Sequence, residues 1–125
     1  MTAGRRFAEF LAEQLAPLGY VSMRRMFGMT GLFRDGVLFA LAGEDALFLR
    51  VNDANRAMFA AAAPVEPLSY ARQGKRIELA YWRAPEQLFD EPEELLAWAR
   101  AALGAAHRVA AARKARPRPR QRPDV

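Results

Sequence analysis

The chain has 125 residues, of which 52% are hydrophobic, enough for one domain with a buried core and too few for two. It contains no cysteine, which excludes disulfides, thiol catalysis and cysteine-based metal sites. No run approaches the ~20 apolar residues that span a bilayer. Glu9 and Glu13 interrupt the N-terminal stretch, so it does not resemble a signal peptide. We therefore expect a cytoplasmic protein.

The net charge of +5 is concentrated at the C-terminal end of the chain. Residues 108–125 carry seven bases and one acid, whereas residues 1–107 carry 12 bases and 13 acids. The body of the protein is therefore nearly neutral. The overall basicity gives no reason to expect that its surface binds nucleic acid.

The first predicted element is a helix over residues 3–16, ended by Pro17 and Gly19. Its apolar residues recur at helical spacing and are Phe7, Phe10, Leu11, Leu15 and Leu18. One apolar face could cover a sheet or form a groove for a partner. Covering a sheet is the more usual role of such a face.

Residues 27–51 predict an antiparallel meander of three short strands. Asp35-Gly36 is typical of a two-residue type I′ turn, and Gly43-Glu44-Asp45 makes the next turn. Gly28 and Gly31 bracket the first strand. We interpret them as a bend or close backbone approach and reject a phosphate-binding loop, because no helix start and no Gly-Lys-Ser/Thr follows.

Apolar residues of this meander fall on both alternating positions. One set contains Leu32, Val37, Phe39, Leu41, Leu47, Leu49 and Val51, and the other contains Phe33, Leu38 and Phe48. Helices can cover one set. The other set would need a second layer or a second subunit, since exposed apolar patches often mark an interface.

The second half of the chain predicts a short helix, two strands and a long helix. Asn52-Asp53 caps a helix to about residue 63, and strands follow over residues 68–73 and 76–82, joined around Gly74-Lys75. These strands mix aromatic with basic residues, namely Tyr70, Arg72, Arg76, Tyr81, Trp82 and Arg83. Such a mixture could stack the nucleobases of a single-stranded nucleic acid, or it could simply reflect the residues that suit a sheet.

The last helix is predicted from residue 90 to about residue 113. Asp90 is the expected N-cap, Pro92 lies in the first turn, and Glu93 completes a capping box. Its predicted buried side contains Leu95, Leu96, Trp98, Ala99, Ala102, Leu103 and Ala106. The chain thus divides into a domain over residues 1–114 and a tail over residues 115–125.

The tail is rich in arginine and proline, and we expect it to be disordered or polyproline-like. One interpretation is an arm that contacts phosphates, with a steep salt dependence. The other is a solvated terminus without a specific ligand. The candidate nucleic-acid-binding residues are Arg113, Lys114, Arg116, Arg118, Arg120 and Arg122.

Nothing in the sequence forms a recognisable catalytic constellation. His107 is the only histidine and lies near the predicted end of the last helix, where the helix dipole favours it. Ser22 and Ser69 have no Gly-x-Ser-x-Gly setting. We therefore predict no catalytic, cofactor-binding or metal-binding residues and a protein that is not an enzyme.

Several short motifs, taken in this order, resemble the N-terminal domain of the TfoX/Sxy family of competence regulators. They lie at residues 24–28 (Arg-Arg-Met-Phe-Gly), 31–33, 35–36, 39–41, 47–51, 55–56, 81–86 and 90–100, so the resemblance covers about residues 5–109. Met29 is a departure, because many members carry a second glycine at that position.

The resemblance implies an α-β3-α-β2-α fold, in which an antiparallel sheet packs against helices as in type III secretion chaperones, often as a dimer. It implies a non-enzymatic protein, linked in some relatives to activation of competence genes together with the cyclic-AMP receptor protein. Full-length regulators carry a second, helical domain, whereas this chain carries the tail. We therefore expect a domain that acts through contacts with a protein partner or with itself as a homodimer. The alternative is a nucleic-acid-binding protein that uses the tail.

Overall fold

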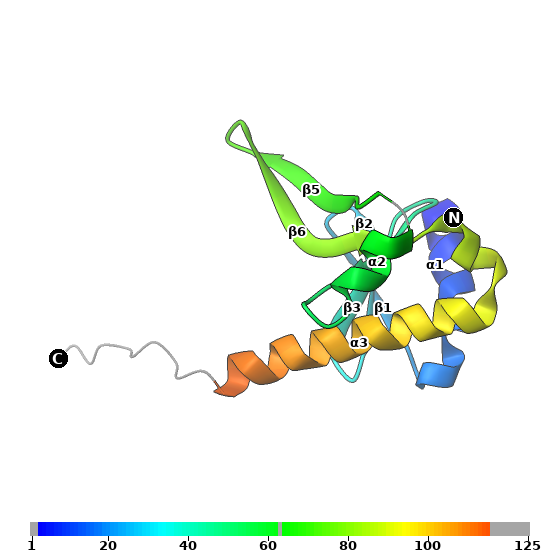
Figure 1. The fold of residues 1–125 in the computed structure, drawn as a ribbon. Helices are drawn as coiled ribbons and strands as arrows, with labels where there is room; N and C mark the ends of the chain where they lie inside the picture. Colours follow the sequence, from blue (N-terminus) through cyan, green and yellow to red (C-terminus); the bar gives the residue numbers. More distant parts are fainter. Residues whose placement is uncertain (1–2, 63, 116–125) are drawn as a thin grey trace.

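The computed structural model describes residues 3–62 and 64–115, and within these ranges it is an α+β fold, as predicted (Figure 1). Six antiparallel strands form one sheet in the order β1-β2-β3-β4-β6-β5. The strands are β1 (Ser22–Met26), β2 (Met29–Arg34), β3 (Val37–Ala42), β4 (Leu47–Arg50), β5 (Pro67–Arg72) and β6 (Lys75–Arg83). The helices are α1 (Ala3–Gln14), α2 (Arg56–Ala62) and α3 (Pro92–Ala115), with 3-10 turns η1 (Ala16–Leu18) and η2 (Glu86–Asp90).

Three hairpins of the sheet close through two-residue turns in which both residues have positive φ. The φ angles are 56° and 76° at Asp35-Gly36, 54° and 72° at Phe27-Gly28, and 52° and 77° at Gln73-Gly74. Positive φ at both positions defines the type I′ turn, which matches the twist of paired strands. The turn at Asp35-Gly36 is confirmed, and the last turn lies one residue earlier than predicted.

The sheet contains one more strand than predicted, because β1 precedes the expected meander. The order is therefore four strands, a helix and two strands, rather than three strands, a helix and two strands. The strand was missed because its sequence, Ser-Met-Arg-Arg-Met, is mostly polar and mostly exposed. The turn that follows it begins with phenylalanine, which rarely adopts positive φ.

A bulge in β3 decides which apolar residues face the helices. Leu32 pairs with Ala40 and Phe33 pairs with Leu38, so Phe39 is an extra residue on β3. An extra residue shifts the alternation of side chains beyond it. Phe39 and Ala40 both join the core beside the helices, and Leu41 turns to the opposite face. The prediction that Leu41 shares a face with Phe39 was wrong for this reason.

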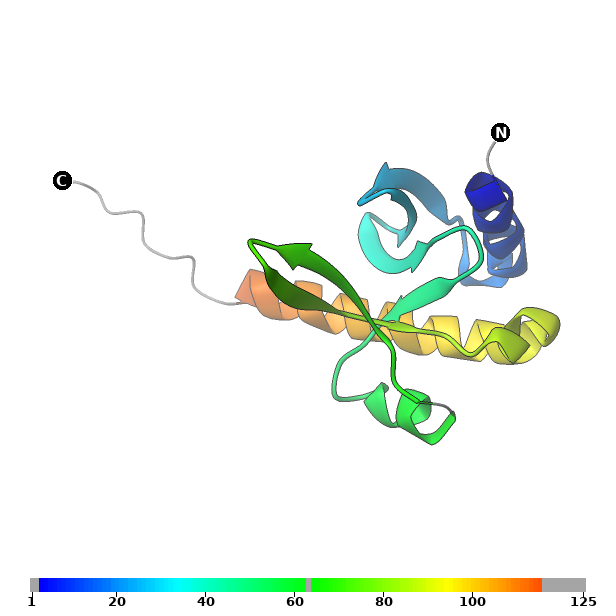
Figure 2. The ribbon, with the colours of Figure 1, turned by 90° about the horizontal axis from the view of Figure 1, so that it is seen from above.

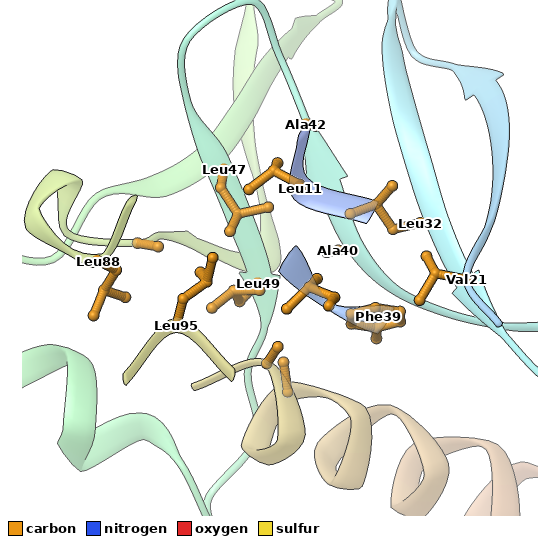
Figure 3. Packing of buried hydrophobic residues seen from close by; sticks show 14 of the residues in the cluster. Leu11, Val21, Leu32, Phe39, Ala40, Ala42, Leu47, Leu49, Leu88 and Leu95 are labelled. Atoms are coloured by element: carbon orange, nitrogen blue, oxygen red, sulfur yellow. The ribbon is translucent and has the colours of Figure 1, made fainter. Parts of the chain in front are cut away.

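All three helices send side chains into one core on the first face of the sheet. Leu11 of α1, Phe59 of α2 and Leu95 of α3 belong to the same buried cluster as Leu49 of β4. Figure 3 shows Leu49 and Leu95 approaching each other beside Phe39 and Leu32. The predicted apolar faces of the first and last helices therefore cover the sheet, although Phe10 remains 37% exposed.

Two helix starts differ from the predicted caps. Helix α3 begins at Pro92, and the Leu95 amide donates to the Glu91 carbonyl, so Glu91 takes the position predicted for Asp90. Asp90 instead ends η2. Helix α2 begins at Arg56, after a turn in which the Asn52 side chain accepts a hydrogen bond from the Ala54 amide.

Candidate functional site

The described residues contain no group of three or more histidines and carboxylates that could hold a metal ion. His107 is exposed on α3. Ser69 accepts a hydrogen bond from Arg76 at 3.2 Å, so its hydroxyl has a structural partner. No helix in residues 3–62 and 64–115 is long and apolar enough to cross a membrane.

An open depression of about 340 Å³ lies where β6 leads into η2. Its charged lining residues are Arg83, Glu66 and Glu86, and the arginine lies 3.8 Å and 3.6 Å from the two carboxylates. Both carboxylates are largely exposed. Exposed ion pairs of this length contribute little energy, and the depression has no enclosed polar group to hold a substrate.

The mixture of aromatic residues and bases on β5 and β6 does not form a stacking surface. Tyr81 is buried, and the Trp82 ring packs edge-on against Phe59 with centroids 5.8 Å apart. Only Tyr70 among the three aromatic residues is exposed, at 45%. Trp82 and Tyr81 are therefore explained by packing. The β5–β6 hairpin nevertheless projects from the body of the molecule, with Arg72, Lys75 and Arg76 exposed at its tip (Figure 1).

The second face of the sheet carries a smaller apolar cluster bordered by arginines. Pairing between strands places five residues in one row across the sheet: Arg24, Gly31, Leu41, Phe48 and Arg83. Gly31 leaves room for neighbours, since a Cβ there would meet the side chains of Met26, Leu38 and Phe33 within 3.1 Å. The strands β1 to β3 are strongly curled in Figure 2.

This cluster is less exposed than the sequence suggested. Leu41 is fully buried, and Phe33, Leu38 and Phe48 are half-buried. Two arginine side chains lie over aromatic rings, Arg24 at 5.6 Å from the Phe33 centroid and Arg50 at 5.3 Å from the Tyr81 centroid. Burial raises the pKa of the Tyr81 hydroxyl, an effect that the neighbouring Arg50 guanidinium opposes.

The two most exposed large apolar side chains of the described residues flank the outer strand β1 instead. Tyr20 precedes the strand and is 81% exposed, Met23 lies on it, and Phe27 follows it and is 71% exposed. Phe27 also has a φ of 54°. A bulky residue has a steric cost in this conformation, and burial of its largely exposed ring offsets little of that cost within the described chain. The strand and its flanking aromatic residues form the candidate interaction surface.

Asn55 lies in the 55–56 motif of the resemblance, but sequence reasoning assigned it no structural role. It is 2% exposed, its amide nitrogen donates to the Arg50 carbonyl at 2.9 Å, and its oxygen accepts from the Asn52 amide at 2.8 Å. The side chain thus fixes the passage from β4 to α2. Its position two residues past the predicted cap was the available signal.

The predicted nucleic-acid-binding residues lie mostly outside the described residues. Arg113 is exposed near the end of α3. The side chain of Lys114 and the residues Arg116, Arg118, Arg120 and Arg122 fall outside the described part, so their assignment stays a prediction.

Comparison with known proteins gives two matches. The model of the TfoX N-terminal domain family matches residues 13–106. Protein Sxy of Escherichia coli (strain K12) is 29% identical over 113 residues, which are 90% of this chain and 54% of Sxy. The chain therefore spans about half the length of this curated relative.

Proposed function

The chain belongs to the TfoX N-terminal domain family, and from this we propose that it acts in transcriptional regulation by binding a protein partner, without catalysing a reaction. The regulated process is natural competence, by similarity to Sxy. The described fold supports a contact function, since its polar groups do not converge on an enclosed site.

The single observation that carries this proposal is the conformation and exposure of Phe27. An aromatic side chain at positive φ costs folding energy, and 71% exposure returns little of that cost through burial. Unfavourable conformations of this kind gather at sites that serve function rather than stability. A partner that covers Phe27 and Tyr20 would bury both side chains, and this burial would stabilise the complex.

The test is complementation in cells that lack the protein, with transcripts of the competence genes measured. The wild-type chain should restore the transcripts, and the double variant Tyr20→Ser/Phe27→Asn should not. Tyr70→Ser is the matched control, because it removes an exposed aromatic ring from the opposite outer strand β5. If deletion leaves these transcripts unchanged, the proposed function is wrong.

Nucleic-acid binding is the second candidate, and the projecting β5–β6 hairpin favours it. Its tip presents three exposed basic side chains, and a two-stranded ribbon fits the major groove of a duplex. Truncation of residues 116–125 and the double variant Lys75→Glu/Arg76→Glu should each reduce duplex binding and flatten its salt dependence. Unchanged binding in both variants would refute this candidate.

A further inference from the structure

We propose that the outer strand β1 binds an extended, acidic segment of a partner protein, which adds to the sheet as a further strand. The proposal rests on the proposed function and names the surface and the chemistry of the partner. Its elements are the free backbone edge of β1, two adjacent arginines that have no acidic partner among the described residues, and the exposed apolar side chains that flank the strand.

The free edge follows from the hairpin that joins β1 to β2. Met26 and Met29 flank the type I′ turn and pair with each other, so they exchange backbone hydrogen bonds. Bonded and non-bonded pairs alternate along an antiparallel ladder. Ser22 and Arg24 therefore also bond to β2, whereas the backbone groups of Met23 and Arg25 point away from the sheet.

No described element pairs with this outward side of β1, which ends the strand order. Figure 2 shows β1, in blue, on the outside of the curled strands and away from α2. Exposed edges of this kind accept an extended peptide through main-chain hydrogen bonds, and side chains on alternating positions provide selectivity.

The charge of β1 indicates an acidic occupant. Arg24 lies over the Phe33 ring, and Arg25 donates to the Thr30 hydroxyl at 3.4 Å and to the Gly28 carbonyl at 3.3 Å. Within residues 3–62 and 64–115, neither guanidinium has a carboxylate within salt-bridge distance. Arg24 and Arg25 alternate between the two faces of the sheet, so carboxylates on successive residues of an added strand would meet both.

The same charges disfavour a second copy of this chain at the edge. In the antiparallel register that overlaps all of β1, Arg24 of one copy would lie directly opposite Arg24 of the other. Shifting that register by two residues toward the turn would instead place Arg25 opposite Arg25. Like charges directly opposite each other destabilise a strand pair. In both of these registers the arginines oppose a homodimer at this edge, and the homodimer itself stays a prediction.

The apolar side chains complete the surface. Met23 is 39% exposed on the strand, with Tyr20 before it and Phe27 after it. An occupant with two adjacent acidic residues and apolar residues on either side would place one carboxylate near each arginine and cover these exposed side chains at either end of the strand. The strained turn at Phe27 would then position a contact for the partner.

The test uses a synthetic peptide with two adjacent glutamates flanked by valines, with a matched peptide that carries lysine in place of both glutamates. Amide hydrogen exchange and NMR titration of the full chain provide the readout. We expect the glutamate peptide to protect the Met23 and Arg25 amides selectively, because their N–H groups form the outward edge of β1. The lysine peptide should give no protection.

Two variants separate strand addition from other contacts. Met23→Pro removes an outward N–H without breaking a hydrogen bond to β2. This variant should therefore fold but no longer bind the glutamate peptide, whereas Met23→Ala should still bind it. The charge reversal Arg24→Glu/Arg25→Glu should weaken binding of the glutamate peptide about tenfold and create affinity for the lysine peptide.

Three outcomes would overturn the proposal: no protection of Met23 and Arg25 at saturating peptide, equal binding of both peptides, or a dimer in solution that Met23→Pro dissociates. The last outcome would identify a second copy as the occupant. These failures are distinct from failure of the proposed function. If transcript levels depend on Tyr20 and Phe27 but the peptide protects no amide of β1, the proposed function is retained and strand addition is rejected. If the peptide protects these amides but transcript levels do not change, strand addition is retained and the proposed function is rejected.

Discussion

At the scale of the residue, Asn55 joins two elements through its side chain alone. Replacing it with alanine would remove the partners of a partly buried carbonyl and a partly buried amide, which costs about 2–3 kcal/mol of unfolding free energy. Urea denaturation of Asn55→Ala measures this loss. Asp53→Ala is the control, because the Asp53 carboxylate is almost fully exposed in its ion pair with Arg56 and should change stability little. Equal effects of the two substitutions would contradict the assignment.

Tyr81 gives the protein a specific sensitivity to alkaline pH. Burial raises the pKa of its hydroxyl above the usual value of 10.0, so the folded state favours the neutral form. This contribution to stability is fully present below the unfolded pKa and is lost as the pH rises through the folded pKa. Urea unfolding at about pH 9 and about pH 11 should therefore show a larger decrease for the wild type than for Tyr81→Phe. Equal decreases would show that another group dominates.

At the scale of the element, the β1–β2 hairpin carries a residue that weakens it. Asparagine tolerates positive φ and asparagine-glycine favours type I′ turns, so Phe27→Asn should raise the unfolding free energy by about 1 kcal/mol. Phe27→Ala is the matched control, because it removes the ring and keeps the steric penalty. Thermal unfolding followed by circular dichroism distinguishes them. The interpretation of Phe27 as a strained contact residue fails if both variants have the stability of the wild type.

The elements with strong local signals were predicted from sequence, and those that depend on long-range pairing were not. Asp35-Gly36 predicted its hairpin correctly, because aspartate and glycine both tolerate the positive φ angles that the turn requires. The strand β1 gave no such signal, since one side of it faces solvent and its turn begins with phenylalanine. The candidate surface along β1 was missed with it, because an edge becomes visible only when the strand order is known.

At the scale of the whole molecule, one core connects the sheet to all three helices. Leu49 is fully buried within it, so Leu49→Ala should cost about 2–5 kcal/mol. Trp82 and Trp98 both pack against Phe59 at this core, and their fluorescence reports on it. Tryptophan fluorescence and far-ultraviolet circular dichroism should give the same urea midpoint in the wild type and the variant. Separate midpoints would show that α2 or α3 unfolds independently.

The extra residue at Phe39 has a consequence for how this chain is matched to any protein with a regular strand in place of β3. An alignment without a gap at this point would assign Val37 and Leu38 to the wrong faces of the sheet. The residue types would not reveal the error, because apolar residues suit both faces. Deletion of Phe39 alone would instead make the strand regular, because Leu38 and Ala40 already face opposite sides of the sheet. Val37 and Leu38 would keep their sides, and the core would lose one fully buried aromatic ring.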